Sequence, residues 1–391
     1  MNEHRADIPK PPQDWWEQVP VLRELFKLLS STDPVNWDLA RQVAYSLGSH
    51  DEPPSEDFED CRRELETMSR AAQVQCEQFT GLVPGTVAPV IGVTRGQWVE
   101  ENVAVFKMLM EPLAAKLTGP ALTGGIPVPI PESAAMVLRQ IGGVLMGLQT
   151  GFVLGYLSRH VIGQYELVLP DPSGGRLLYV IPNMQQAEQD WELDPREFRY
   201  WIALHEVTHH LEFSRPWTRR YFHSQIQTMI DSLDFDPARL QETLEGFDIT
   251  NPEKMAETLQ DPEALIQAAW TPLGLDTMSR LQAFMTLVEG YATFVMDAVG
   301  AAVLKDHARL KEVMERRKRT SSPGEQLLER LLGLELKRKQ YDAGVKFCRY
   351  VAGVHDVAFL NKAWDNPDSL PTASEIDNPD GWIERMSEAG L

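Results

Sequence analysis

The sequence predicts a mainly α-helical fold with one small β-hairpin, which is an α+β protein dominated by helices. Apolar residues recur at helical spacing along most of the 391 residues. A single pair of short apolar runs, separated by prolines and glycines, is typical of strands. Hydrophobic residues make up 43% and charged residues 24% of the chain, which excludes a disordered or fibrous protein.

The N-terminal third divides into an extension and the first helices of the body. Residues 1–60 are acidic, rich in proline and contain tryptophan, so we expect an extension that packs on the main domain, residues 61–391. Helical spacing of apolar residues predicts helices over 60–79 and 95–117. The glycine- and proline-rich stretch 118–131 is expected to be a connection.

Residues 141–157 form the most apolar segment of the chain. Gly143, Gly147, Gly151 and Gly155 recur at every fourth position, so on a helix they form a smooth stripe that another backbone can approach closely. About 17 residues is at the short limit for crossing a bilayer. We therefore expect a buried central helix rather than a membrane span.

A hairpin and a capped helix follow. Residues 165–169 and 177–181 are predicted to be its strands. Asp194, Pro195 and Glu197 form a helix-start pattern with a capping box, and the helix should end near residue 213, before a proline. Later helices are predicted over 261–269, 276–305 and 324–351.

Charge and cysteine content limit the partners and the compartment. With 37 Lys+Arg against 57 Asp+Glu the formal charge is −20, which disfavours nucleic acids and anionic membranes as partners. Cys61, Cys76 and Cys348 stand at spacings that match no metal-ligand pair, and we expect buried thiols. No secretory signal is visible, so a cytoplasmic protein is expected. The sequence carries no signal of the oligomeric state.

The predicted helix that begins at Asp194 contains an H-E-x-x-H motif at residues 205–209. Side chains four residues apart on a helix differ by about 40° in direction, so His205 and His209 can bind one zinc ion. Glu206 points in an adjacent direction, where its carboxylate can act as general base on a water at the ion. His210 lies about 140° round the helix from His205 and is not expected to be a ligand.

A catalytic zinc ion needs a third protein ligand, and Glu289 is the best candidate. It stands in an almost wholly apolar helix, where a buried carboxylate requires a partner. An ion pair with an arginine is the alternative. Asp297, two turns further along, is expected to accept the free ring N–H of a ligand histidine or to make a structural bond. Tyr291 is a candidate catalytic donor to the oxyanion, as are Tyr341 and His223, unless these rings serve only in packing.

Several stretches resemble a family of zincin-like hydrolases of metallopeptidase type that is associated with biosynthesis of a deazaflavin coenzyme in actinobacteria. They are HEVTHH with Pro216 and Trp217, MTLVEGYATFVMDAVG, LLGLELKRKQYDAGVKF, and residues 370–383. The resemblance covers about residues 100–391 and implies a zincin-like core with a zinc site. In that family the residue at position 291 is commonly histidine, and Tyr291 here favours Glu289 as the ligand.

These observations predict a zinc-dependent hydrolase in which metal-activated water attacks a peptide or related amide bond. His205, His209 and Glu289 would bind the zinc ion, and Glu206 would pass the proton to the leaving nitrogen. An extended substrate is expected to pair with an edge strand beside the metal helix, for which strand 177–181 is the candidate. The alternative is a degenerate zincin scaffold that binds a metal and a protein partner without turnover.

Overall fold

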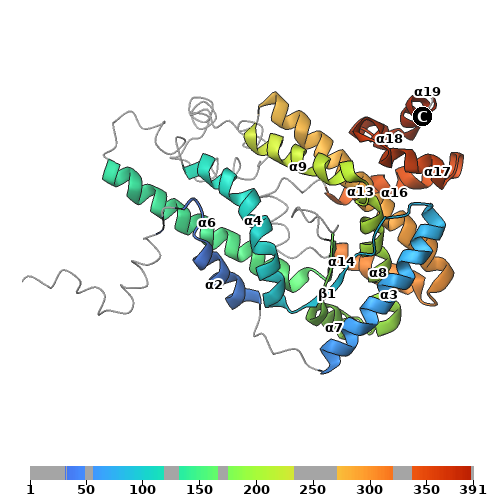
Figure 1. Cartoon of the computed structure of the whole chain (residues 1–391), viewed down its shortest axis with the longest axis horizontal. Coiled ribbons are helices and arrows are strands. Elements are labelled where there is room, and N and C mark those ends of the chain that lie inside the picture. Colours follow the sequence, from blue (N-terminus) through green and yellow to red (C-terminus); the bar gives the residue numbers. More distant parts are fainter. Residues whose placement is uncertain are drawn as a thin grey trace, which may run out of the picture.

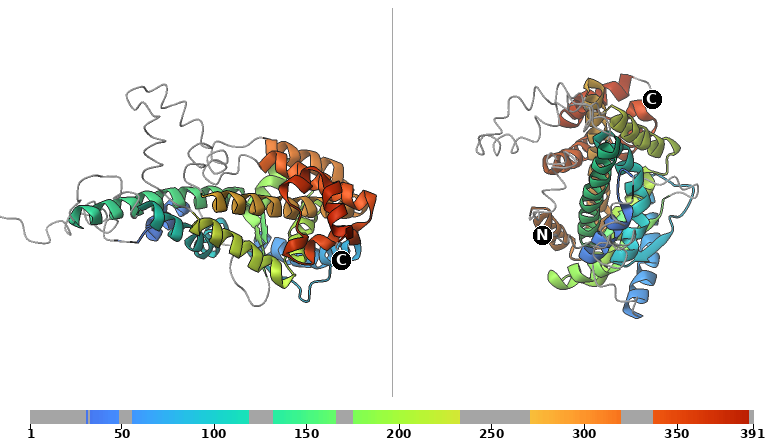
Figure 2. Two further views of the ribbon diagram at one scale, coloured as in Figure 1. Left: turned by 90° about the horizontal axis from the view of Figure 1, so that it is seen from above. Right: turned by 90° about the vertical axis from the view of Figure 1, so that its left-hand side faces the viewer.

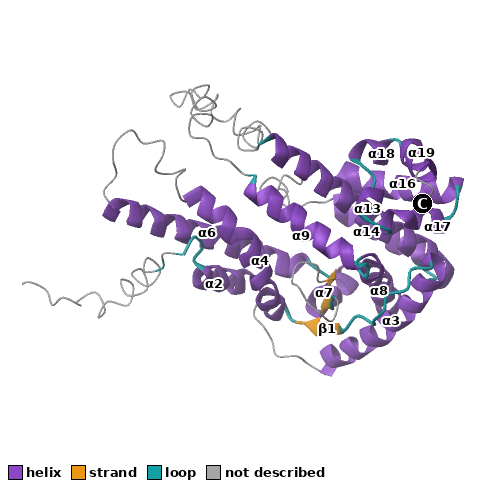
Figure 3. Ribbon diagram, turned by 45° about the horizontal axis from the view of Figure 1, so that its top comes forward, coloured by secondary structure: helices purple, strands orange, loops and turns teal. Residues whose placement is uncertain are grey.

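A computed structural model of the chain describes residues 31, 33–48, 56–118, 132–165, 175–232, 271–319 and 337–388. The longer helices in these ranges are α2 (Trp37–Gly48), α3 (Glu56–Thr80), α4 (Arg95–Thr118), α6 (Glu132–His160), α7 (Ile181–Asp190), α8 (Pro195–Glu212), α9 (Pro216–Asp231), α13 (Pro272–Val303), α14 (His307–Arg319) and α16 (Lys337–Val354). Short helices follow at the C-terminus: α17 (Val357–Leu360), η3 (Asn361–Trp364), η4 (Pro367–Ser369), α18 (Ala373–Asp377) and α19 (Pro379–Glu388). The predicted mainly helical architecture with a small sheet is confirmed (Figures 1 and 3).

Most predicted helices are present within a few residues of their expected bounds. α3, α4, α8 and α13 match four of them, and α16 matches the second part of 324–351. Residues 261–269 and 320–336 lie outside the described residues. Pro216 does end the preceding helix, but it is also the first residue of α9, which the sequence analysis did not predict. Proline suits that first position because the N–H it lacks would have no partner inside the helix.

The sheet has three strands in the order β1-β3-β2. β2 (Gly163–Tyr165) pairs antiparallel with β3 (Leu177–Val180), which confirms the predicted hairpin, although its first strand begins two residues early and residues 166–174 are not described. β1 (Val90–Val93), which was not predicted, pairs parallel with β3. β3 is therefore the central strand, and the expectation that 177–181 forms an edge strand is wrong.

Two hydrophobic cores meet at the sheet. Alternate residues of a strand point to opposite faces, and Leu177 and Tyr179 of β3 join the larger core formed with α3, α8, α13 and α16. Leu178 and Val180 join a second core formed with α2, α4 and α6. The sheet thus connects the two groups of helices, and α6 runs away from the C-terminal helices, which lie at the other end of the molecule (Figure 2).

The glycine stripe of α6 packs directly on α2 and the residues before it, which confirms the predicted close approach of backbones. A Cβ atom added to Gly147 would lie 2.5 Å from the carbonyl oxygen of Asn36, and one on Gly151 would lie 2.6 Å from that of Ala40. The expectation of a buried central helix is wrong, however, since Leu145 and Phe152 are 55% and 54% exposed. By length and composition α6 and α13 could each cross a membrane, and their most apolar windows are 39% and 56% buried in the protein.

The C-terminal helices are held together by a charged network around Glu375. Its carboxylate accepts hydrogen bonds from the backbone N–H of Thr372, in a capping box, and from Nε and Nη2 of Arg385 at 2.7 and 2.9 Å. Burial alone would raise the pKa of Glu375, but these bonds to the charged form hold it below its ordinary value of 4.5.

Replacing Glu375 by Gln is expected to lower the free energy of unfolding by about 1–2 kcal/mol at pH 7. A carboxyl group whose pKa is lowered by folding stabilises the protein above its unfolded pKa, and this contribution is lost as the pH falls through the folded pKa. The difference between wild type and variant should therefore shrink below about pH 4. Urea unfolding at pH 7, 5 and 3.5 measures this difference in the free energy of unfolding. A constant difference across this range would contradict its origin in the charged Glu375 carboxylate.

Candidate metal centre

Asp194 caps the start of helix α8 as predicted, whereas the predicted capping box with Glu197 does not form. The carboxylate of Asp194 accepts hydrogen bonds from the N–H groups of Arg196 and Glu197, each at 3.0 Å. Glu197 does not complete a capping box, because its Oε2 accepts instead from the backbone N–H groups of Lys305 (2.8 Å) and Asp306 (3.3 Å) at the end of α13. Glu197 thus ties α8 to the helix that supplies the third candidate ligand.

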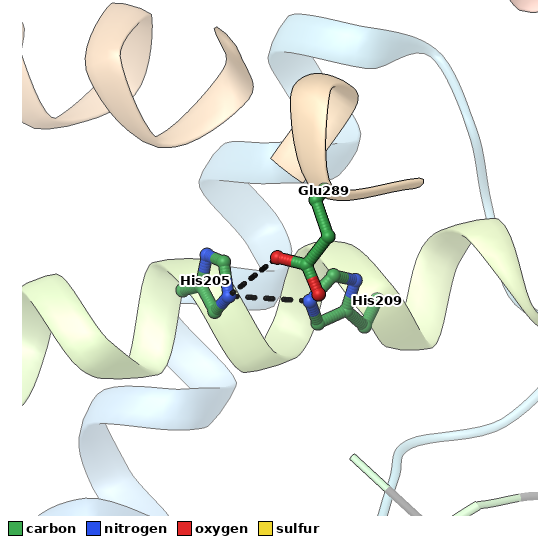
Figure 4. Close-up of side chains that lie close together, drawn as sticks. All are labelled: His205, His209 and Glu289. Carbon is green, nitrogen blue, oxygen red and sulfur yellow. Dashed lines mark hydrogen bonds and ion pairs between the residues drawn. The ribbon is translucent and has the colours of Figure 1, made fainter. Parts of the chain in front are cut away.

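His205, His209 and Glu289 meet between α8 and α13, as the sequence predicted (Figure 4). The Nε2 atoms of the two histidines are 3.2 Å apart, and Nε2 of His205 lies 3.8 Å from Oε2 of Glu289. One ligand atom from each of the three residues lies within 4.8 Å of the others. Donor atoms around a tetrahedral zinc ion are separated by roughly 3.3 Å at the usual bond lengths, so the three side chains need only small shifts to bind one.

The donor set and its exposure fit a catalytic metal ion. Two imidazole nitrogens and one carboxylate form the His₂Glu set that zinc accepts in sites with an open position. The side chain of His209 is 10% exposed, whereas those of His205 and Glu289 are each 23% exposed. The open side of the cluster is therefore the one that His205 and Glu289 face.

Glu206 lies between α8 and strand β2. The residue is 5% exposed, and the backbone N–H of Tyr165 donates a hydrogen bond to its carboxylate. A Cβ atom on Gly163 would come within 2.6 Å of Oε1 of Glu206, so only glycine allows the strand to pass so close. Burial raises the pKa of Glu206 to about 7, against the opposing effect of His209 and with a smaller contribution from Glu289. A carboxyl group with such a pKa can take up and release a proton near neutral pH.

Glu212 is a residue of the site that the sequence analysis missed. Its side chain is fully buried, and Oε2 lies 2.7 Å from Nδ1 of His209. Burial raises the pKa of Glu212 to about 7, and its proximity to His209 partly offsets that effect. The available signal was its position three residues after His209, which places both side chains on one face of the helix.

Asp297 and Tyr291 do not contact the candidate ligands in the ways that were expected. Asp297 pairs with Lys311 at 2.5 Å and with Arg349, so the structural alternative is the one observed. Asp297 stands about 12 Å along α13 from Glu289, and the carboxylate that accepts a hydrogen bond from a candidate ligand histidine is that of Glu212 instead.

Tyr291 faces away from Glu289, about 200° round the same helix. Its ring is fully buried, and its hydroxyl donates to Oδ1 of Asn361 at 2.6 Å. Burial raises the pKa of Tyr291 well above its ordinary value, so the hydroxyl stays protonated in this structural bond. The assignment of Tyr291 as a catalytic donor is therefore wrong for this conformation.

The remaining candidates take structural places or are not described. Nε2 of His210 makes a hydrogen bond of 2.9 Å with the carbonyl oxygen of Thr86, and His210 was not expected to be a ligand. His223 lies on α9 beside Phe222, and the side chain of Tyr341 lies outside the described residues. All three cysteines are buried free thiols, as expected.

Replacing Glu289 by Ala is expected to lower zinc affinity by more than about 100-fold. Loss of a direct ligand should exceed the 10- to 100-fold cost of losing a partner outside the coordination sphere. Competition titration with a chromophoric chelator measures the affinity. Glu384→Ala, at an exposed position on α19, is the matched control and should bind zinc like the wild type. Unchanged affinity in Glu289→Ala would remove this residue from the site.

Paired helical histidines, a neighbouring buried glutamate and a carboxylate from a second helix are side chains of the kind that metal-dependent hydrolases use. The chain belongs to the zincin-like metallopeptidase family, whose sequence model matches residues 35–383. It is also similar to a protein from Chloroflexus aurantiacus whose crystal structure was described as that of "a putative hydrolase with a novel fold". The two share 27% identity with a TM-score of 0.67, over 90% of this chain and 99% of that one. No curated protein matches the chain.

Proposed function

We propose that the protein is a zinc-dependent hydrolase that cleaves a peptide or related amide bond. The observation that carries the proposal is the convergence of His205, His209 and Glu289, from segments about 80 residues apart, with Glu206 buried beside them. Membership of the zincin-like metallopeptidase family and the similarity to a protein described as a hydrolase support the same reaction class.

Each step of the proposed reaction has a candidate residue. A zinc ion bound by the two histidines and Glu289 would supply a Lewis acid that lowers the pKa of a coordinated water toward 7. The carboxylate of Glu206 takes a proton from the attacking water and delivers it to the leaving nitrogen. The N–H of Tyr165 and the close backbone at Gly163 hold the Glu206 carboxylate in place for both transfers.

An extended substrate is placed along β2 in this proposal. β2 is an edge strand of the sheet and passes directly over Glu206. Edge strands offer unpaired backbone groups to which an extended peptide can bind as a further strand. This proposal moves the expected substrate strand from β3 to β2.

The test uses the wild-type protein. We expect about one zinc ion per chain by elemental analysis, cleavage of a broad peptide library, loss of cleavage with a chelator and recovery with added zinc. A zinc-containing protein that cleaves no peptide, but binds a defined protein tightly, would favour the non-turnover scaffold instead. Retention of Glu206 argues against that alternative, since a purely structural site needs no base beside an open position.

The compartment, the pathway and the partners are also proposals. A formal charge of −20 favours a protein that binds neither nucleic acid nor an anionic membrane, and we propose a cytoplasmic location. The association with deazaflavin coenzyme biosynthesis rests on the sequence resemblance alone. Fractionation of cells and isolation of bound substrates would test these points.

A further inference from the structure

Glu212 occupies a position that is unfavourable for a carboxylate in three respects. Its side chain is fully buried, where an ionised group loses the solvation of water. Its Oε1 has no hydrogen-bond partner among the described residues. It is also the last residue of α8, where the negative end of the helix dipole repels an anion.

The compensating interaction that we identify is with His209. Oε2 of Glu212 lies 2.7 Å from Nδ1 of that ring. In the neutral ring that binds a metal ion, a carboxylate acceptor at this distance fixes the proton on Nδ1 and leaves the lone pair of Nε2 for the ion. Nε2 is the atom of His209 that faces His205 in the candidate site.

Glu188 shows how this protein uses a buried carboxylate for structure. It is 7% exposed, and its two oxygens accept from Nε and Nη2 of Arg199 at 2.7 and 2.8 Å. Both oxygens are thus satisfied by a cation on the neighbouring helix. Glu212 lacks such an arrangement, because Oε1 has no partner in the part of the chain that the structure describes and the residue bonded to Oε2 is itself a candidate metal ligand.

We propose that Glu212 is a positioning residue that orients His209 and increases its basicity toward the metal ion, at a cost to the stability of the metal-free protein. The inference rests on the proposed function, because it requires that His209 binds a metal. Carboxylates that act in this way through a ligand histidine contribute 10- to 100-fold to metal affinity.

The experiment combines zinc titration with thermal unfolding of the zinc-free protein. Glu212→Gln keeps the shape of the side chain but removes its charge, and Glu212→Leu also removes the acceptor. We expect zinc affinity to fall about 10- to 100-fold in Glu212→Gln and further in Glu212→Leu. The unfolding temperature of the zinc-free variants should be equal to or higher than that of the wild type, because both variants remove a buried negative charge. Cobalt(II) in place of zinc should show altered d–d absorption bands.

Glu188→Gln is the matched control. It breaks a paired buried carboxylate away from the site, so its unfolding temperature should fall while its zinc affinity stays within about twofold of the wild type. Variants of Glu212 that lose thermal stability but bind zinc like the wild type would show a structural role and overturn the inference. A wild type that binds no zinc would overturn the proposed function, and this inference with it.

Discussion

Replacing Glu206 by Gln is expected to leave zinc binding intact and to lower peptide hydrolysis by about 1,000-fold. General acid–base groups contribute between about 10² and 10⁴ to the rate. The amide oxygen of glutamine can still accept the hydrogen bond from the N–H of Tyr165, so the side chain should keep its place against Gly163. It cannot take a proton from water, however, and the proposed reaction needs that transfer.

The measurement compares cleavage rates at saturating zinc, on a peptide selected with the wild type, with zinc content determined in parallel. Glu384→Gln, on the exposed face of α19, should have the rate of the wild type. A variant of Glu206 that loses zinc would indicate a ligand rather than a base. A variant that keeps both zinc and full activity would assign the proton transfer to another group.

The parts of the fold that were predicted correctly are those that depend on local sequence. The start of α8 follows from Asp194 and Pro195, whose effects act within one helical turn. β1 was missed because it is a four-residue strand, and its pairing partner β3 lies more than 80 residues further along the chain. The burial of α6 was predicted wrongly from its apolar composition, because the number of helices that cover an apolar helix depends on the tertiary arrangement.

The candidate site shows the same division. His205, Glu206 and His209 follow from the geometry of one helix, and Glu289 follows from a carboxylate that stands in an apolar helix. The spacing of three residues places Glu212 beside His209, but the full burial of Glu212 depends on how the end of α8 packs against other helices, which the spacing does not show. The sequence left two roles open for Asp297, a hydrogen bond to a ligand histidine and a structural bond. Its partners, Lys311 and Arg349, come from helices whose packing on α13 is set by tertiary contacts.

The crossing of α13 and α16 next to the site predicts a second large effect. Gly344 of α16 lies against α13 so closely that an added Cβ atom would be 2.1 Å from the carbonyl oxygen of Thr286 and 3.1 Å from Cα of Gly290. Cβ atoms do not approach a backbone oxygen to this distance, so the two helices must move apart in Gly344→Ala. Gly290 is adjacent to Glu289, and a shift of α13 therefore displaces the third candidate ligand.

Gly344→Ala is expected to lower the free energy of unfolding by about 2 kcal/mol or more, because overpacking in a close-packed core typically costs 1–3 kcal/mol. This expected loss of stability is opposite to the effect of helix propensity, since alanine in place of glycine would by itself stabilise α16 by about 1 kcal/mol. Zinc affinity should fall at least about tenfold, as it does when support for a ligand is lost, although no residue of the site is changed. Urea unfolding and chelator competition measure the two quantities.

Gly353→Ala, in the same helix, separates the two causes. Among the described residues, no atom outside the local turn of the helix lies within 4 Å of a Cβ atom at that position. Only helix propensity should therefore act, and the variant should be as stable as the wild type or more stable, by up to about 1 kcal/mol. Its zinc affinity should be unchanged, because α13 keeps its place. If Gly344→Ala instead resembled Gly353→Ala in both measurements, the close crossing would not be what positions Glu289 opposite the histidines of α8.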